Sequence, residues 1–262
     1  MRRVCLLVCG FFWAMAAMAA EGIRLASGFE VVKLPAALMP ADEWPTSPLL
    51  CARRDGLWFA GRHNLWRIGT RAAQLDAPLP IEDFTCSESG TPVLVVGGRL
   101  GPLQGRLFVP RVPLPSPHTR LAAGAQDSLI LFETQAPARL FRFDGRQAQL
   151  VATLAEPILA ASHAGDFVLI ATPTAIWRVR PGEPLGLLLP LVETKPVISL
   201  AVHPRTAEIL FASEDEIFLL DDGRAAQIAG GLGGALAVTD EGIFVADGRR
   251  KGIYRLTPRS AR

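Results

Sequence analysis

Residues 243–256 read Ile-Phe-Val-Ala-Asp-Gly-Arg-Arg-Lys-Gly-Ile-Tyr-Arg-Leu, and residues 209–223 read Ile-Leu-Phe-Ala-Ser-Glu-Asp-Glu-Ile-Phe-Leu-Leu-Asp-Asp-Gly. Each stretch has an apolar run that ends in alanine, then a short polar segment and a second apolar run. Short runs of Val, Ile, Leu and aromatic residues on either side of a polar turn are typical of a β-hairpin. The two stretches begin 34 residues apart and therefore predict a structural unit that the chain uses repeatedly.

The same pattern recurs along the chain. The first apolar runs of six such units start at positions 57, 93, 129, 168, 209 and 243. A third apolar stretch and a turn precede the unit, as at 235–242, and a fourth strand-like stretch follows it, as at 226–229. Four strands in a unit of about 40 residues match the blade of a β-propeller.

The sixth unit ends after its third strand, whereas Phe29–Leu34 precedes the first unit and belongs to none. Pairing the two would remove sheet edges that otherwise act as templates for aggregation. The sequence therefore predicts an all-β fold, a six-bladed β-propeller closed by an N-terminal strand. A β-sandwich, the alternative, would not repeat at this period.

The second unit is irregular. Its second apolar run, 107–109, stands far from the first, 93–96, and the gap between them is rich in glycine. Four prolines follow within 110–117, where they remove donors that a sheet needs. We therefore expect this blade to lack a regular outer strand.

The repeats, above all Ile243–Asp247 followed by Ile253–Leu256, resemble those of the NHL and gluconolactonase-like (senescence marker protein) group of six-bladed propellers. The resemblance spans about residues 28–258. In the gluconolactonase-like family, metal-bound water hydrolyses a lactone or an ester, and one metal ligand is a glutamate near the first inner strand. The resemblance thus implies such an activity as one possibility, with Glu43 in the matching region.

The first twenty residues have the composition of a secretory leader. Arg2 and Arg3 precede an apolar run, 4–15, which is followed by small residues up to Ala20. This order predicts a signal peptide over residues 1–20 and a single propeller domain over residues 21–262. The apolar run is shorter than the ~20 residues that cross a bilayer, and no later segment approaches that length. We therefore expect a periplasmic or secreted protein with no transmembrane segment after removal of the signal.

Charge argues against nucleic acid as a partner. The chain has 27 basic and 25 acidic residues, and loss of Arg2 and Arg3 with the leader leaves 25 of each. A protein without net charge has no overall field that attracts an anionic polymer.

Two of the four cysteines, Cys5 and Cys9, lie in the leader. Cys51 and Cys86 then remain in an oxidising compartment, at similar places in the inner strands of consecutive blades. Neighbouring inner strands lie side by side at the channel, so the two residues are predicted to form a disulfide. A pair of buried free thiols is the alternative.

Candidate functional residues were sought in the loops that converge on one propeller face, because binding groups concentrate in such loops. The connections between blades carry carboxylates that could bind a hard cation such as Ca²⁺: Glu43, Asp83, Glu156 and Glu193. The loops between second and third strands carry polar residues of a candidate binding face: His63, Asn64, Glu133, Asp215 and Asp247. No nucleophile motif or phosphate-binding loop is present, so no catalytic residue is predicted.

Two functions remain open. The favoured hypothesis is a non-catalytic platform without a cofactor, which binds a protein or a small-molecule ligand at one propeller face. The alternative is a Ca²⁺-dependent lactone or ester hydrolase of the gluconolactonase-like kind. Calcium would stabilise the folded protein only in the second case, because a ligand that binds the native state raises its stability.

Overall fold

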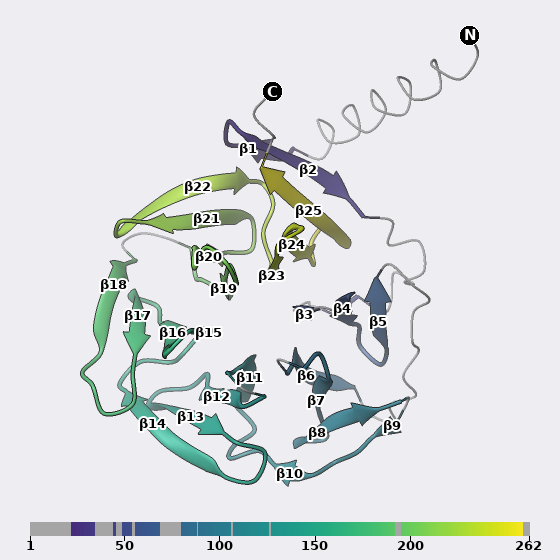
Figure 1. The fold of residues 1–262 in the computed structure, drawn as a ribbon, viewed down its shortest axis with the longest axis vertical. Helices are drawn as coiled ribbons and strands as arrows, with labels where there is room; N and C mark the ends of the chain where they lie inside the picture. The colour runs from purple at the N-terminus through teal and green to yellow at the C-terminus, as the bar shows by residue number, and fades with distance from the viewer. Residues whose placement is uncertain are drawn as a thin grey trace.

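The computed structural model describes residues 22–34, 44–45, 49–53, 56–68, 80–87, 89–105, 107–125, 127–191 and 195–258. Over these residues, six antiparallel sheets stand around a central channel (Figure 1). The predicted all-β, six-bladed propeller is therefore confirmed. None of the described residues forms a helix long and apolar enough to cross a membrane.

The strands of each blade follow one another from the channel outward. Blade 1 contains β3 (Leu49–Arg53), β4 (Gly56–Ala60) and β5 (Leu65–Ile68). Blade 2 contains β6 (Ile81–Cys86), β7 (Pro92–Val96), β8 (Arg99–Gln104) and two short strands on β8, β9 (Leu107–Phe108) and β10 (Val112–Pro113). Blade 3 contains β11 (Thr119–Ala123), β12 (Leu129–Glu133), β13 (Ala138–Phe143) and β14 (Ala148–Leu154).

The later blades follow the same order. Blade 4 contains β15 (Ala160–Ala164), β16 (Phe167–Ala171), β17 (Ala175–Val179) and β18 (Gly186–Pro190). Blade 5 contains β19 (Ser199–Val202), β20 (Ile209–Ala212), β21 (Glu216–Asp221) and β22 (Arg224–Gly230), with β1 (Arg24–Leu25) outside β22. Blade 6 contains β23 (Ala235–Thr239), β24 (Gly242–Asp247), β25 (Gly252–Pro258) and, outermost, β2 (Phe29–Lys33).

The hydrophobic core lies between the blades. Trp58 and Leu65 of blade 1 pack with Phe84 of blade 2 in one cluster, and Phe59 of blade 1 packs with Phe244 of blade 6 in another. The second strand of each blade is covered by a neighbouring blade on both faces, so it is apolar without alternation. This explains the apolar runs that repeat in the sequence.

The N-terminal strand closes the ring as predicted. β2 pairs antiparallel with β25 from Phe29 opposite Pro258 to Lys33 opposite Tyr254. Val31 is buried against blades 5 and 6, and the ammonium group of Lys33 lies 5.4 Å from the centre of the Tyr254 ring. β1 then extends blade 5, with Arg24 opposite Gly230, a fifth strand that the sequence did not predict.

In blade 2 the predicted irregular outer edge is confirmed, but the predicted position of the third strand is wrong. The prediction placed that strand at 107–109; the structure places it at Arg99–Gln104, inside the supposed gap. Gly97 and Gly98 both have positive φ, 58° and 68°, and Val96 lies opposite Arg99 across them. Two such residues make a tight hairpin turn, so the chain reverses directly after β7.

The predicted disulfide between Cys51 and Cys86 is present and joins β3 of blade 1 to β6 of blade 2. The two Cα atoms are 6.0 Å apart, within the range that a disulfide spans. Cys51 lies opposite Trp58 and Cys86 opposite Pro92, so the bridge joins different levels of the two inner strands.

Removal of the closing strand should open the ring. Deletion of residues 22–34 leaves the edge of β25 and apolar surface around Tyr254 exposed, so we expect aggregation or loss of a single cooperative unfolding transition. Deletion of residues 22–26 alone removes β1 but keeps β2, and serves as the control with a milder effect. A monomeric 22–34 deletion with an unchanged melting temperature would contradict this role of β2.

Loss of the disulfide should cost substantial stability. The bridge closes a loop with a sequence separation of 35 residues, and the chain-entropy model gives roughly 3–4 kcal/mol for a loop of this size. We expect the double variant Cys51→Ala/Cys86→Ala, and the reduced wild-type protein, to unfold at correspondingly lower urea concentration. Alkylation of unreduced, unfolded protein, followed by mass measurement, should leave both cysteines unmodified.

Candidate functional site

The central channel has a volume of about 1230 Å³ and is lined by all six inner strands. We call the face that carries the loops between blades and the loops between second and third strands the loop face. At this end the charged residues that line the channel are Glu82, Asp83, Arg120, Glu214 and Arg249. They come from the first residues of inner strands and from the β20–β21 and β24–β25 loops.

A buried polar residue stands at or just beyond the end of the second strand in blades 3 to 6: Glu133, Thr172, Ser213 and Asp247. Each accepts a hydrogen bond from a backbone N–H in the turn that follows or at the start of the next strand. Thr172 accepts from Ala175 at 3.2 Å, and Ser213 accepts from Asp215 at 3.4 Å. These four residues hold the loops of the loop face in place, because they satisfy turn donors that would otherwise lack partners.

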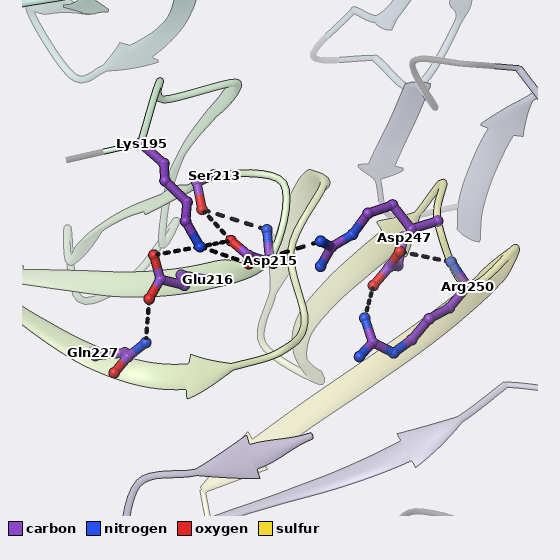
Figure 2. Close-up of polar contacts among 8 residues, drawn as sticks. Lys195, Ser213, Asp215, Glu216, Gln227, Asp247 and Arg250 are labelled. Atoms are coloured by element: carbon purple, nitrogen blue, oxygen red, sulfur yellow. Dashed lines mark hydrogen bonds and ion pairs between the residues drawn. The ribbon is translucent and has the colours of Figure 1, made fainter. Parts of the chain in front are cut away.

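Asp247 is fully buried, and its carboxylate is bound within its own loop. One oxygen accepts a hydrogen bond from the backbone N–H of Arg250 at 2.9 Å. The other contacts the guanidinium of Arg250, also at 2.9 Å (Figure 2). Asp247, predicted as a binding-face residue, is thus a turn cap with a charged partner.

Glu133, a second predicted binding-face residue, has the same kind of partner. Arg139, which follows it across the β12–β13 turn, donates to both carboxylate oxygens, at 2.6 and 2.8 Å. These side-chain hydrogen bonds, more than any other cause, lower the pKa of Glu133. The carboxylate is therefore ionised, and the positive charge of Arg139 balances its negative charge.

Asp215 is the centre of an ion-pair cluster that joins three loops (Figure 2). The ammonium group of Lys195, before blade 5, lies 2.7 and 2.6 Å from the two carboxylate oxygens. Arg249, in the β24–β25 loop, lies 3.7 Å from Asp215, and Glu216 lies 3.7 Å from Lys195. The hydrogen bond from Lys195 is the main reason that the pKa of Asp215 is lowered.

Asp83 ties blade 2 to blade 3 beside the channel. Its carboxylate accepts hydrogen bonds from the backbone N–H groups of Phe84 at 2.8 Å and Leu121 at 2.6 Å. Burial disfavours the charged form and raises the pKa of Asp83 to about 6, although both N–H donors and the nearby Arg120 oppose the shift.

The predicted metal ligands fall into two groups. Glu43 and Glu193 lie outside the described residues. The carboxylate of Asp83 accepts two backbone N–H groups. Both oxygens of Glu156 lie 2.9 Å from the hydroxyl of Thr174, between blades 3 and 4. Within the part of the chain that the structure describes, no three His, Cys, Asp or Glu side chains converge as metal ligands would. The four-carboxylate calcium site therefore stays a prediction.

His63 and Asn64 lie half-buried on the β4–β5 loop of the loop face, where the carbonyl of Asn64 accepts the N–H of Gly61 at 2.7 Å. Arg120 and Lys195 belong to no motif of carboxylates or histidines, so the sequence does not indicate them as site residues. The signal for Arg120 is its place in the repeat: it lies opposite Phe132, where the next blade has Ala160 opposite Ala171, so an arginine replaces a small apolar residue.

No family model matches the chain, and a search of curated proteins finds no match. Solved structures with the same fold include a gluconolactonase from Xanthomonas campestris, with a TM-score of 0.66, 14% identity and 93% of each chain covered. A putative gluconolactonase follows with a TM-score of 0.61, 12% identity and coverage of 90% of this chain and 94% of that one. A putative TolB from Agrobacterium tumefaciens has a TM-score of 0.61 at 11% identity, over 91% of this chain and 100% of that one. At such low identity the likeness establishes the six-bladed fold, in agreement with the resemblance seen in the sequence.

The raised pKa of Asp83 predicts a pH dependence of stability. A carboxyl that binds its proton more tightly in the folded state stabilises the fold below its unfolded pKa of about 3.8, and this contribution is lost as pH rises through about 6. The difference amounts to about 3 kcal/mol.

Relative to the wild type, the variant Asp83→Asn should therefore show a flatter decline in urea midpoint between pH 4 and 7. Asp144→Asn serves as the control, because hydrogen bonds from the backbone of Gln147 and Arg146 lower the pKa of Asp144 instead. Parallel wild-type and Asp83→Asn curves over this range would show that Asp83 is not the titrating group.

Proposed function

We propose that the protein is a non-catalytic binding platform, with its ligand or protein partner bound at the channel mouth on the loop face. One observation carries this proposal: four of the described carboxylates of that face are already bound within the protein. Asp83 binds two backbone N–H groups, Glu133 binds Arg139, Asp215 binds Lys195 and Asp247 binds Arg250.

Such carboxylates are suited to a structural role. A general base must reach the proton that it removes, and a metal ligand needs oxygens that point to a common centre. Here each carboxylate instead fixes a turn or joins neighbouring blades, which gives a rigid rim. Pre-organised loops on a rigid scaffold favour binding, because little conformational entropy is lost on association.

The proposal includes a periplasmic or secreted location and no cofactor. The disulfide between Cys51 and Cys86 supports this location, because structural disulfides persist in oxidising compartments. The leader-like composition of residues 1–20 points the same way.

A Ca²⁺-dependent lactone or ester hydrolase is the second candidate. The structural likeness to a gluconolactonase favours it. In that case Glu43, Asp83, Glu156 and Glu193 would hold the cation, and the cation would supply a Lewis acid for hydrolysis. Asp83 and Glu156 would then bind the cation in addition to their present hydrogen-bond partners.

Calcium removal separates the two candidates. For the platform we expect the melting temperature to be the same with excess EDTA and with millimolar Ca²⁺, and no hydrolysis of glucono-δ-lactone or p-nitrophenyl acetate above the rate in buffer. The variant Glu156→Gln should behave like the wild type in both conditions. Stabilisation by Ca²⁺ together with hydrolysis that falls in Glu156→Gln would establish the hydrolase instead.

A further inference from the structure

Two arginines line the channel mouth from opposite sides. Arg120 stands near the start of β11 in blade 3, and Arg249 lies in the β24–β25 loop of blade 6. Blades 3 and 6 face each other across the channel (Figure 1). Both side chains are exposed.

The two guanidinium groups differ in their partners. Arg249 lies 3.7 Å from the carboxylate of Asp215 and so has an acidic neighbour. Arg120 donates one hydrogen bond, at 2.7 Å, to the uncharged backbone carbonyl of Glu82, and its acidic neighbour Asp83 is a buried carboxyl on which it acts only through its charge. A guanidinium has five N–H donors in a planar fork that matches a carboxylate, so Arg120 retains donors for an anion at the mouth.

The acidic side chains beside Arg120 have hydrogen-bond partners of their own. Both oxygens of Glu82 lie within 3.2 Å of the backbone N–H of Gly98 in the β7–β8 turn. Asp83 is buried and binds the N–H groups of Phe84 and Leu121. Glu214, exposed on blade 5, is the remaining acid that the channel mouth presents among the described residues.

Below the arginines the channel wall is mostly apolar and made of small side chains. Ala122, Ala161, Ala201 and Ala237 contribute to it from four successive inner strands. Ile198, at the mouth, is 42% exposed and also lines the channel. A hydrocarbon chain placed there would lose contact with water, which favours its binding.

We propose that the channel binds a carboxylate-headed apolar molecule, with its head on the guanidinium of Arg120 and its hydrocarbon body along the channel wall. This inference rests on the proposed binding function and names the class of ligand. It assigns Arg120 as the residue that selects a charged head. Arg249 makes a smaller contribution to binding of the head, because Asp215 already offsets its charge.

The experiment is calorimetric titration of the full chain, in EDTA, with acetate, hexanoate and decanoate, and with decanol as the neutral counterpart. We expect affinity to rise on the order of fourfold for each added methylene group, since each buried CH₂ contributes about 0.8 kcal/mol. Decanol should bind at least about tenfold more weakly than decanoate, because it lacks the charge-assisted hydrogen bonds.

Variants then locate the head group. Arg120→Gln should weaken decanoate binding by about tenfold or more and leave decanol binding unchanged, whereas Arg120→Lys should restore part of the loss. Arg205→Gln is the matched control, since Arg205 lies on the opposite propeller face, is 75% exposed and pairs with Asp240 at 2.7 Å. Glu214→Gln should strengthen binding, because it removes a negative charge from the mouth.

Equal melting temperatures would show that the variants are folded. Absence of decanoate binding, an affinity independent of chain length, or equal losses in Arg120→Gln and Arg205→Gln would overturn the inference. These outcomes do not depend on catalysis, because carboxylates are not hydrolysed and the metal is removed. Failure here is therefore distinct from failure of the platform proposal, which is judged by calcium response and hydrolysis.

Discussion

The pairing of β2 with β25 is the constraint on which the rest of the structure depends. A propeller has no central core; each blade is stabilised by the two blades beside it, as the clusters between blades 1 and 2 and between blades 6 and 1 show. Such a ring is complete only if the last blade is complete. Here the last blade takes its outer strand from the N-terminal part of the chain, so closure of the ring depends on one antiparallel pair of strands.

The loop face follows from this ring because polar side chains tie the blades together around the channel. Cys51 and Cys86 join blades 1 and 2, Asp83 and Leu121 join blades 2 and 3, and Ser199 accepts the N–H of Leu236 between blades 5 and 6. The ion pairs of Asp215 with Lys195 and Arg249 add links between loops of the same face. Asp83, Asp215 and Asp247 thus have partners within the protein, whereas the guanidinium of Arg120 keeps N–H donors beyond the one that it uses.

Much of the fold could be predicted from the sequence, because the period of the apolar runs and the orphan strand at Phe29–Leu34 are local signals with one consistent interpretation. The third strand of blade 2 could not be predicted, since the spacing of the apolar runs places Gly97-Gly98 in a gap, whereas in the structure the two glycines form a turn. β1 has only two residues and gains its place by pairing with β22, a contact with no local signal. For the candidate site, the sequence placed the polar residues on loops of one face, but it could not show that Asp247 contacts Arg250 or that Asp83 accepts the N–H of Leu121. Such pairings depend on the neighbouring blade and on side-chain direction.

The position of β2 also orders the events of folding. Glu30 and Thr257 contact each other across a sequence separation of 227 residues, nearly the whole described chain. During synthesis, β2 is made long before its partner β25. Blades with complete local hairpins can form meanwhile, but the N-terminal strand waits until the final strand is available. For that interval β2 stays unpaired and Val31 uncovered, which leaves the chain prone to aggregation until synthesis reaches β25.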